Sequence, residues 1–245
     1  MTERIYSTDA YAHEVEATVV EVDDERGAVL LDRTVFYPGG GGQPADRGAL
    51  WVGEDRLAVE KVATDAKGVW HVLGGGDGTG LRVPTVGTTV RGELDWDRRL
   101  RLMRTHTAMH ALCGVVWDRF ESPVTGGNME PGEGRLDFEI ADWDRERDLQ
   151  PIEDELNRQL AAQRPVEISF LPREQADEDP SLIRTKVSLL PDSLRTVRVV
   201  DIVGLDRQAD GGTHVADTGQ VGSVHVVKVD NKGKGFRRIR IALDD

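Results

Sequence analysis

Residues 94–120, LDWDRRLRLMRTHTAMHALCGVVWDRF, separate two parts of the chain that have different sequence patterns. From Asp97 to Phe120, apolar residues recur at helical spacing and no proline interrupts them, which predicts one long helix. The residues before this helix have strand patterns, whereas those after it mix helix and strand patterns. We therefore expect an α+β protein with two domains, residues 1–92 and residues 93–245.

The first part consists of short apolar or alternating runs, which are typical of β-strands. Many short strands joined by glycine-rich turns predict a small, glycine-rich β-barrel. The expected strands are Glu16–Val22, Ala28–Leu31, Leu57–Val62, Val69–Leu73 and Thr88–Leu94. The expected turns are residues 23–27, 39–42, 53–55 and 74–80.

The part after the long helix contains one more helical pattern and several strand patterns. A helix is expected from about Asp148 to Gln163, with Pro151 in its first turn, where a proline is well tolerated. Apolar residues at helical spacing form one stripe on it. The expected strands are Val166–Leu171, Thr196–Ile202, Gln220–Lys228 and Phe236–Leu243.

The composition is acidic and rich in arginine. The 245 residues include 44 Asp and Glu against 31 Lys and Arg, a net charge of −13, and 25 of the 31 basic residues are arginine. This balance is typical of proteins from salt-rich cytosols and predicts a halophilic protein, although net charge also serves ordinary solubility. The charge argues against a general polyanion binder, so a nucleic acid would need a local basic patch.

The sequence excludes several classes of protein. No run approaches the roughly 18 apolar residues that a membrane-spanning helix needs, and the N-terminus has no apolar core of a secretory signal. Cys113 is the single cysteine, which rules out an internal disulfide and a zinc site with two cysteines of this chain. We expect a cytoplasmic protein without a membrane partner.

The long helix carries a histidine pair. His106 and His110 are four residues apart and therefore share one helix face, which is the spacing by which a helix offers two imidazoles to one metal ion. The same spacing also occurs in surface or hydrogen-bonded histidines. Cys113 is a rival ligand on the same face, but it lies about 10 Å along the helix from His106, so packing in the core is the better interpretation.

A second group of polar residues is Asp210-Gly211-Gly212-Thr213-His214, which predicts a tight turn after a strand. Alone, it is best explained as a turn capped by the aspartate. Together with the histidine pair, Asp210 and His214 would complete a set of three imidazoles and one carboxylate, which zinc accepts.

The third stretch is TVFYPGGGGQPADRG, residues 34–48. Glycines have almost no side-chain surface, so a ligand or another backbone segment can approach Gly41 and Gly42 closely. Thr34 offers a hydroxyl, and Gln43 offers a donor and an acceptor. The stretch is equally well explained as a turn that lets two domains pack.

Three stretches in this order, TVFYPGGGGQPADRG (34–48), LDWDRRLRLMRTHTAMHAL (94–112) and DGGTHVADTGQVG (210–222), closely resemble the alanyl-tRNA editing proteins of the AlaX type, in their medium-length form. These proteins are similar to the editing part of alanyl-tRNA synthetase without its aminoacylation domain. The resemblance covers nearly the whole chain. It implies a small β-barrel joined to an α+β editing domain of the threonyl/alanyl-tRNA synthetase type.

The resemblance also implies an activity, an ATP-independent hydrolase that edits in trans. It would deacylate mischarged seryl-tRNA(Ala), and glycyl-tRNA(Ala) as a further candidate, by binding the acceptor end of tRNA(Ala). Thr34 and Gln43 match residues that face the bound amino acid, and Gly41 and Gly42 belong to the same substrate-binding stretch.

The metal implied by the resemblance is one zinc ion. His106, His110 and His214 match three ligand positions, and Asp210 stands where the family usually has cysteine. A carboxylate makes the site harder, so other divalent metals compete better than at a thiolate site.

Two basic clusters are candidates for tRNA contact, although such clusters are often only a solvated face. The candidate residues are Arg98, Arg101, Lys232, Lys234, Arg237 and Arg238. Two other function classes stay open, a metal-dependent esterase or amidase on a small molecule and a non-catalytic tRNA-binding module. The oligomeric state is not indicated.

Overall fold

The computed structural model describes residues 2–74, 83–182 and 194–244, so most of the expected turn 74–80 lies outside the described residues. The chain forms two compact units, the first made of residues 1–40 and 44–100 and the second of residues 41–43 and 101–245. In sequence, the change from one unit to the other falls inside helix α1 (Trp96–Phe120). The domain boundary between residues 92 and 93 stays a prediction.

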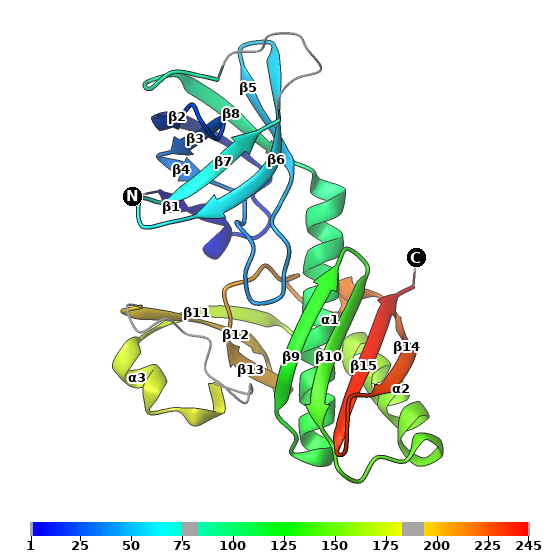
Figure 1. The fold of residues 1–245 in the computed structure, drawn as a ribbon. Helices are drawn as coiled ribbons and strands as arrows, with labels where there is room; N and C mark the ends of the chain where they lie inside the picture. The colour runs from blue at the N-terminus through cyan, green and yellow to red at the C-terminus, as the bar shows by residue number, and fades with distance from the viewer. Residues whose placement is uncertain (1, 75–82, 183–193, 245) are drawn as a thin grey trace. The chain divides into compact units, whose positions relative to one another are not determined.

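The first unit is a closed β-barrel, as expected, and its strands follow one another in the order β2-β3-β7-β6-β5-β8 (Figure 1). All neighbouring pairs with described register are antiparallel. A short parallel pair, β1 (Glu3–Arg4) with β4 (Arg33–Thr34), accompanies the barrel. The barrel strands are β2 (Glu14–Asp23), β3 (Ala28–Leu31), β5 (Gly48–Val52), β6 (Asp55–Thr64), β7 (Val69–Leu73) and β8 (Thr89–Leu94).

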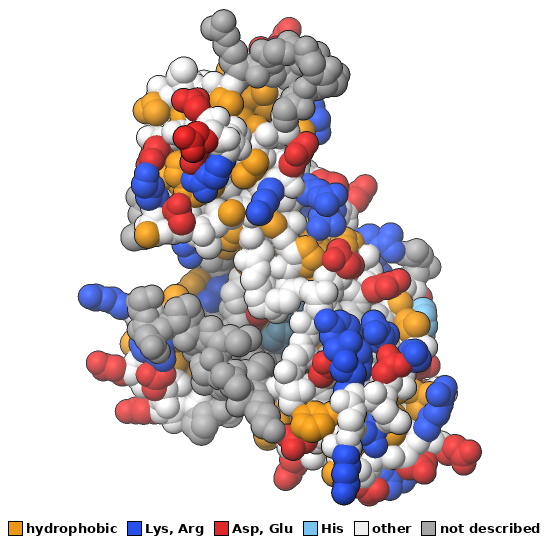
Figure 2. All heavy atoms as spheres, in the orientation of Figure 1, with side chains coloured by type: hydrophobic (Ala, Val, Ile, Leu, Met, Phe, Trp, Pro, Cys, Tyr) orange, Lys and Arg blue, Asp and Glu red, His pale blue; other side chains and the backbone are white. Residues whose placement is uncertain are grey.

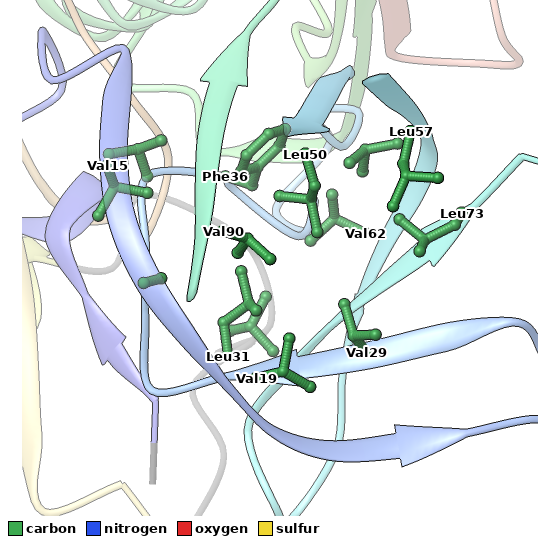
Figure 3. Packing of buried hydrophobic residues seen from close by; sticks show 14 of the residues in the cluster. Val15, Val19, Val29, Leu31, Phe36, Leu50, Leu57, Val62, Leu73 and Val90 are labelled. Carbon is green, nitrogen blue, oxygen red and sulfur yellow. The ribbon is translucent and has the colours of Figure 1, made fainter. Parts of the chain in front are cut away.

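The barrel encloses an aliphatic core (Figure 3). Alternate residues of the strands point inward. Val19, Val29, Leu31 and Leu50 of the strands, and Phe36 in the segment after β4, are all 0% exposed. Burying each of these side chains contributes about 1.5–3 kcal/mol. The short apolar and alternating runs thus predicted five of the six barrel strands, whereas β5 was not expected.

A buried ion pair anchors both ends of the stretch 34–48, which belong to the first unit. The guanidinium of Arg99 and the carboxylate of Asp46 are 0% and 1% exposed, and Arg99 also donates to the Val35 carbonyl at 2.6 Å. Asp46 in turn accepts from the backbone N–H of Tyr37 at 2.6 Å. The mutual attraction of the two charges and these hydrogen bonds offset the large cost of removing both charges from water.

The second unit contains a four-stranded antiparallel sheet with the order β14-β15-β10-β9, and helices α1 and α2 (Arg145–Ala161) lie behind it in Figure 1. Strand β10 alternates between exposed and buried residues, so one face of the sheet packs inward and the other faces solvent. The strands are β9 (Val124–Glu130), β10 (Glu133–Glu139), β14 (Val224–Asn231) and β15 (Phe236–Leu243).

A second, three-stranded antiparallel sheet has the order β11-β12-β13, and helix α3 (Arg173–Asp177) follows its first strand. Its strands are β11 (Val166–Pro172), β12 (Thr196–Ile202) and β13 (Asp206–Ala209). Strand β13 ends one residue before Asp210, so the sheet delivers the turn that carries Asp210 and His214.

Two expected elements differ from the structure. Helix α2 begins at Arg145 because the Asp144 side chain accepts from the backbone N–H of Arg147 at 2.8 Å, so Pro151 lies inside the helix and not in its first turn. The expected strand Gln220–Lys228 begins only at Val224, because a 3-10 turn (Thr218–Val221), capped by Asp217, occupies its start. The α+β class itself is confirmed.

No helix within the described ranges has both the length and the apolar character that crossing a membrane requires.

Candidate metal centre

Four polar side chains converge in the second unit. His106 and His110 come from one face of α1, and Asp210 and His214 come from the turn after β13. One nitrogen or oxygen atom of each side chain lies within 4.8 Å of the corresponding atoms of the other three. His214 Nε2 lies 3.0 Å from one oxygen of Asp210, and His106 Nε2 lies 3.7 Å from the other. The four residues predicted from sequence are therefore brought together, and they could hold a metal ion.

Each imidazole in this group has a side-chain hydrogen-bond partner at its Nδ1 atom. The three pairs are His106 Nδ1 with Gln43 Oε1 at 3.1 Å, His110 Nδ1 with Asp206 Oδ2 at 2.9 Å, and His214 Nδ1 with Thr107 Oγ1 at 3.2 Å. An amide oxygen and a carboxylate can only accept, so His106 and His110 carry their proton on Nδ1. Their Nε2 lone pairs are then left for a ligand, which is the usual arrangement of metal-binding histidines.

Burial keeps two of the imidazoles neutral. Desolvation lowers the pKa of His106 to about 4. Desolvation, with the charge of His106, also places the pKa of His214 well below its ordinary value. His110 differs: burial lowers its pKa, but the hydrogen bond and charge of Asp206 outweigh burial and raise it.

Asp210 supplies the negative charge of the group. Burial raises the pKa of Asp210, but attraction to His106 and the hydrogen bond from His214 outweigh burial and hold the pKa well below its usual value. An ionised carboxylate beside buried imidazole nitrogens is a donor set that fits a divalent cation. The residues present therefore fit a metal ion, with a carboxylate as the fourth donor.

The turn from Asp210 to His214 packs closely against the other residues of the group. The backbone N–H of Gly212 donates to Asp210 Oδ2 at 2.7 Å, as expected for an aspartate-capped turn. A Cβ on Gly212 would lie 2.4 Å from Cε1 of His106 and 2.7 Å from Oε1 of Gln43. The capping role and the ligand role of Asp210 are thus compatible, since its other oxygen faces His106.

The glycine-rich stretch contributes three residues to the second unit, Gly41, Gly42 and Gln43. The Gly42 carbonyl accepts from the backbone N–H of Met129 at 3.2 Å, and a Cβ on Gly41 would lie 3.6 Å from Asp210 Oδ1. Gly41 and Gly42 have φ values of 58° and 93°, which favour glycine.

Thr34 belongs to the first unit and is 0% exposed. Its hydroxyl lies 2.8 Å from Nε2 of His71 and accepts from the backbone N–H of Phe36 at 3.0 Å. Burial lowers the pKa of His71 to about 4, so this ring is neutral. The contact of Thr34 with an amino acid stays a prediction.

Cys113 does not belong to the four-residue group. Its side chain is buried on α1, with 6% of its surface exposed. This position agrees with a cysteine that packs in the core.

Comparisons with known proteins identify related sequences. Residues 197–240 match the model of the threonyl and alanyl tRNA synthetase second additional domain, and residues 5–98 match that of tRNA synthetases class II (A). The alanyl-tRNA editing protein AlaX-M of Methanosarcina barkeri is 38% identical over 251 residues, covering 100% of both chains. AlaX-M of Saccharolobus solfataricus is 36% identical, covering 98% of both. The chain belongs to the AlaX-M family of alanyl-tRNA editing proteins.

A larger protein contains a similar segment. The alanine–tRNA ligase of Pyrococcus abyssi is 34% identical over 246 residues, which cover 100% of this chain but 26% of the ligase. This chain is therefore similar to one part of that enzyme, as the resemblance implied.

The predicted tRNA-contact residues occupy different places in the structure. Arg98 lies in the first unit, where it donates to the Ala45 carbonyl at 3.4 Å, whereas Arg101 lies in the second. Lys232 and Lys234 are exposed between β14 and β15. Arg237 and Arg238 are in β15, and Arg238 makes two hydrogen bonds to Asp137, at 2.6 and 2.7 Å. The role of these residues in tRNA contact stays a prediction.

The sheet carries a basic row that the sequence pattern did not reveal. Lys228 pairs with Arg240, and Arg240 pairs with Arg135, on neighbouring strands of the solvent-facing side. Their side chains are 63%, 43% and 31% exposed. Like charges directly opposite one another are unfavourable in a sheet unless something compensates them, here in part Asp230 and Asp137. Figure 2 shows Lys and Arg side chains gathered over this part of the sheet.

The sequence patterns did not predict two of the side chains that hydrogen-bond to the histidine Nδ1 atoms, Thr107 and Asp206. Thr107 directly follows His106, and Asp206 precedes Asp210 by four residues, so both were visible near the motifs. Nothing in the local pattern distinguished them from ordinary polar residues, because their role depends on the packing of β13 against α1.

Proposed function

We propose that this chain is a trans-editing hydrolase that deacylates mischarged seryl-tRNA(Ala) and, as a second substrate, glycyl-tRNA(Ala). The names of its AlaX-M relatives and the synthetase family models support alanyl-tRNA editing. The observation that carries the proposal is the convergence of three imidazoles and one carboxylate. In two of these imidazoles, His106 and His110, hydrogen bonds fix the proton on Nδ1 and leave Nε2 for a metal ion.

The metal of this proposal is a zinc ion held by His106, His110, Asp210 and His214. When bound, such an ion supplies Lewis acidity next to the ester that is to be hydrolysed. An aminoacyl ester is already activated, so a modest catalyst suffices. Gln43 and Asp206 keep the His106 and His110 lone pairs directed at the centre, and burial keeps the rings of His106 and His214 uncharged at neutral pH.

Discrimination against alanine is assigned to Thr34. A hydroxyl has one donor and two acceptor positions, and Phe36 N–H and His71 occupy two of these three. One position therefore remains to pair with the hydroxyl of a seryl group, and this position would go unpaired with alanine. Gly41 and Gly42 are the backbone segment that we propose beside the substrate, and Gly41 borders the metal group, since its Cβ would lie 3.6 Å from Asp210 Oδ1.

The partner in this proposal is the acceptor end of tRNA(Ala). The exposed Lys232 and Lys234, with Arg237 and the basic row of the same sheet, are the phosphate contacts that we propose in the second unit. Arg98 and Arg101, which precede His106 on α1, are the proposed contacts nearer to the metal ligands in sequence. A net charge of −13 makes such local patches necessary for tRNA binding.

Deacylation assays test the proposal. The metal-loaded protein should release serine from seryl-tRNA(Ala) and leave alanyl-tRNA(Ala) intact, and Thr34→Val should reduce this ratio. Equal hydrolysis of a free seryl ester without tRNA would instead favour a small-molecule esterase. A protein that binds the tRNA without hydrolysing it would be a binding module.

A further inference from the structure

The buried amide of Gln43 lies between two parts of the metal centre. Gln43 is 3% exposed. Its Oε1 accepts from the backbone N–H of Thr213 at 2.9 Å and lies 3.1 Å from Nδ1 of His106. Its Nε2 donates to the hydroxyl of Thr213 at 2.9 Å. One side chain thus joins the ligand helix to the turn that carries the other two ligands.

The orientation of this amide follows from its neighbours. The backbone N–H of Thr213 can only donate, so the atom that faces it must be the oxygen of Gln43. The same oxygen faces Nδ1 of His106, which must therefore carry the proton. The deprotonated nitrogen of His106 is then Nε2, which points toward Asp210.

We infer that Gln43 is a positioning residue of the metal centre, which fixes the tautomer and ring direction of His106. This inference rests on the proposed metal site and differs from a role in facing the amino acid. Two donors occupy the oxygen of Gln43, and Thr213 takes one of its two N–H groups. Only one N–H is left for any other partner. Gly212 also packs against this pair, since its Cβ would lie 2.7 Å from Oε1 of Gln43.

Metal affinity is the readout that separates the two roles. Gln43→Met keeps the approximate volume but removes the acceptor. It should weaken metal binding about 10–100-fold, as loss of an outer partner of a ligating histidine does. Gln43→Glu keeps an acceptor for His106, and the Thr213 hydroxyl can turn to donate to it, so affinity should stay close to wild type or rise. Chelator competition measures affinity, and the absorption spectrum of bound Co²⁺ reports ligand geometry.

Gln159→Met is the matched control. Gln159 is a buried glutamine on α2 of the same unit, 6% exposed, and it pairs with Glu155 and Arg164 rather than with the metal group. It should bind metal as the wild type does. Circular dichroism of the metal-free variants confirms that each is folded before its affinity is compared.

The outcomes are distinct. In the first outcome, the wild type binds metal, and Gln43→Met has the same metal affinity and Co²⁺ spectrum but no deacylation activity. Gln43 then acts on the substrate, so our inference is overturned while the proposed metal centre stands. If the wild type binds no metal, the metal centre and the inference fail together. Weakened binding in Gln43→Met, with recovery in Gln43→Glu, supports both.

Discussion

The backbone of Gly212 lies directly against the imidazole of His106, because a Cβ on this glycine would fall 2.4 Å from Cε1 and 2.5 Å from Nδ1 of the ring. Such distances essentially do not occur, so any side chain at this position must displace His106 or the turn. A Cβ on the neighbouring Gly211 would have no described atom within 4 Å apart from its chain neighbours. The two adjacent glycines of the turn therefore serve different purposes.

Gly212→Ala should accordingly lose metal affinity and Gly211→Ala should not. We expect the loss to be at least about tenfold, comparable with that from removing a group that orients a ligand. Chelator competition on both purified variants measures it. Equal affinities would show that the turn and the ring can move apart freely.

Asp210 should set the metal preference. Asp210→Cys places a soft thiolate in the donor set, so the ratio of zinc affinity to manganese affinity should rise by about tenfold or more. Parallel titrations with the two ions measure this ratio, and Asp217→Cys, in the cap of the nearby 3-10 turn, controls for an added thiol. An unchanged ratio would mean that Asp210 does not contact the ion.

Asp148 should stabilise the second unit in a pH-dependent way. Its carboxylate is 0% exposed and accepts from Arg147 at 2.8 Å and Arg119 at 2.7 Å. The hydrogen bond from Arg147 lowers the pKa of Asp148 far below its ordinary value, and Arg119 and the Asp144 backbone N–H add to this. The ionised form therefore stabilises the fold above the unfolded pKa of about 3.9, and this contribution is lost as the pH falls through the folded value.

Asp148→Asn should thus lower the free energy of unfolding at pH 7 by about 2 kcal/mol, as expected for lost hydrogen bonds to charged groups. The difference from wild type should shrink below about pH 4. Urea unfolding at several pH values measures it. A difference that is constant from pH 7 to pH 3 would contradict an ionic role for Asp148.

The exposed lysines between β14 and β15 should contribute to tRNA binding through phosphate contacts. Replacing Lys232 and Lys234 by glutamine should weaken binding and reduce the slope of log K against log salt by about 0.7–0.9 per lost contact. Filter binding at several salt concentrations measures the slope. Replacing Arg145 and Arg158 on α2 by glutamine is the control, because it removes the same number of positive charges elsewhere in the second unit. If this control variant reduced the slope by the same amount, the effect would come from net charge and not from phosphate contacts of the lysines.

The long helix and most barrel strands were predictable because local periodicity determined them. Helix α1 was expected from Asp97 and begins at Trp96. In contrast, β9 and β10 were missed, because glycines and charged residues fill their solvent-facing positions and few apolar side chains, such as Met129, Leu136 and Phe138, are buried along them. Strand β13 was also missed, since four residues are too few for a pattern.

The candidate site was predictable in its ligands but not in their support. The spacing of His106 and His110 and the chemistry of Asp210 and His214 pointed to one centre, and the structure brings them together. Their partners Gln43 and Asp206 come from distant segments, at 63 and 96 residues from the rings that they contact. No local sequence signal encodes such separations, so the position of Gln43 needed the folded chain.

The central claim is that one metal ion, held by His106, His110, Asp210 and His214, is needed for editing. It is tested most directly by measuring metal content and seryl-tRNA(Ala) deacylation on the same untagged samples of wild type and His106→Ala. We predict about one metal ion per wild-type chain with deacylation, and the loss of both in the variant. Deacylation that persists in a metal-free His106→Ala protein would contradict the claim.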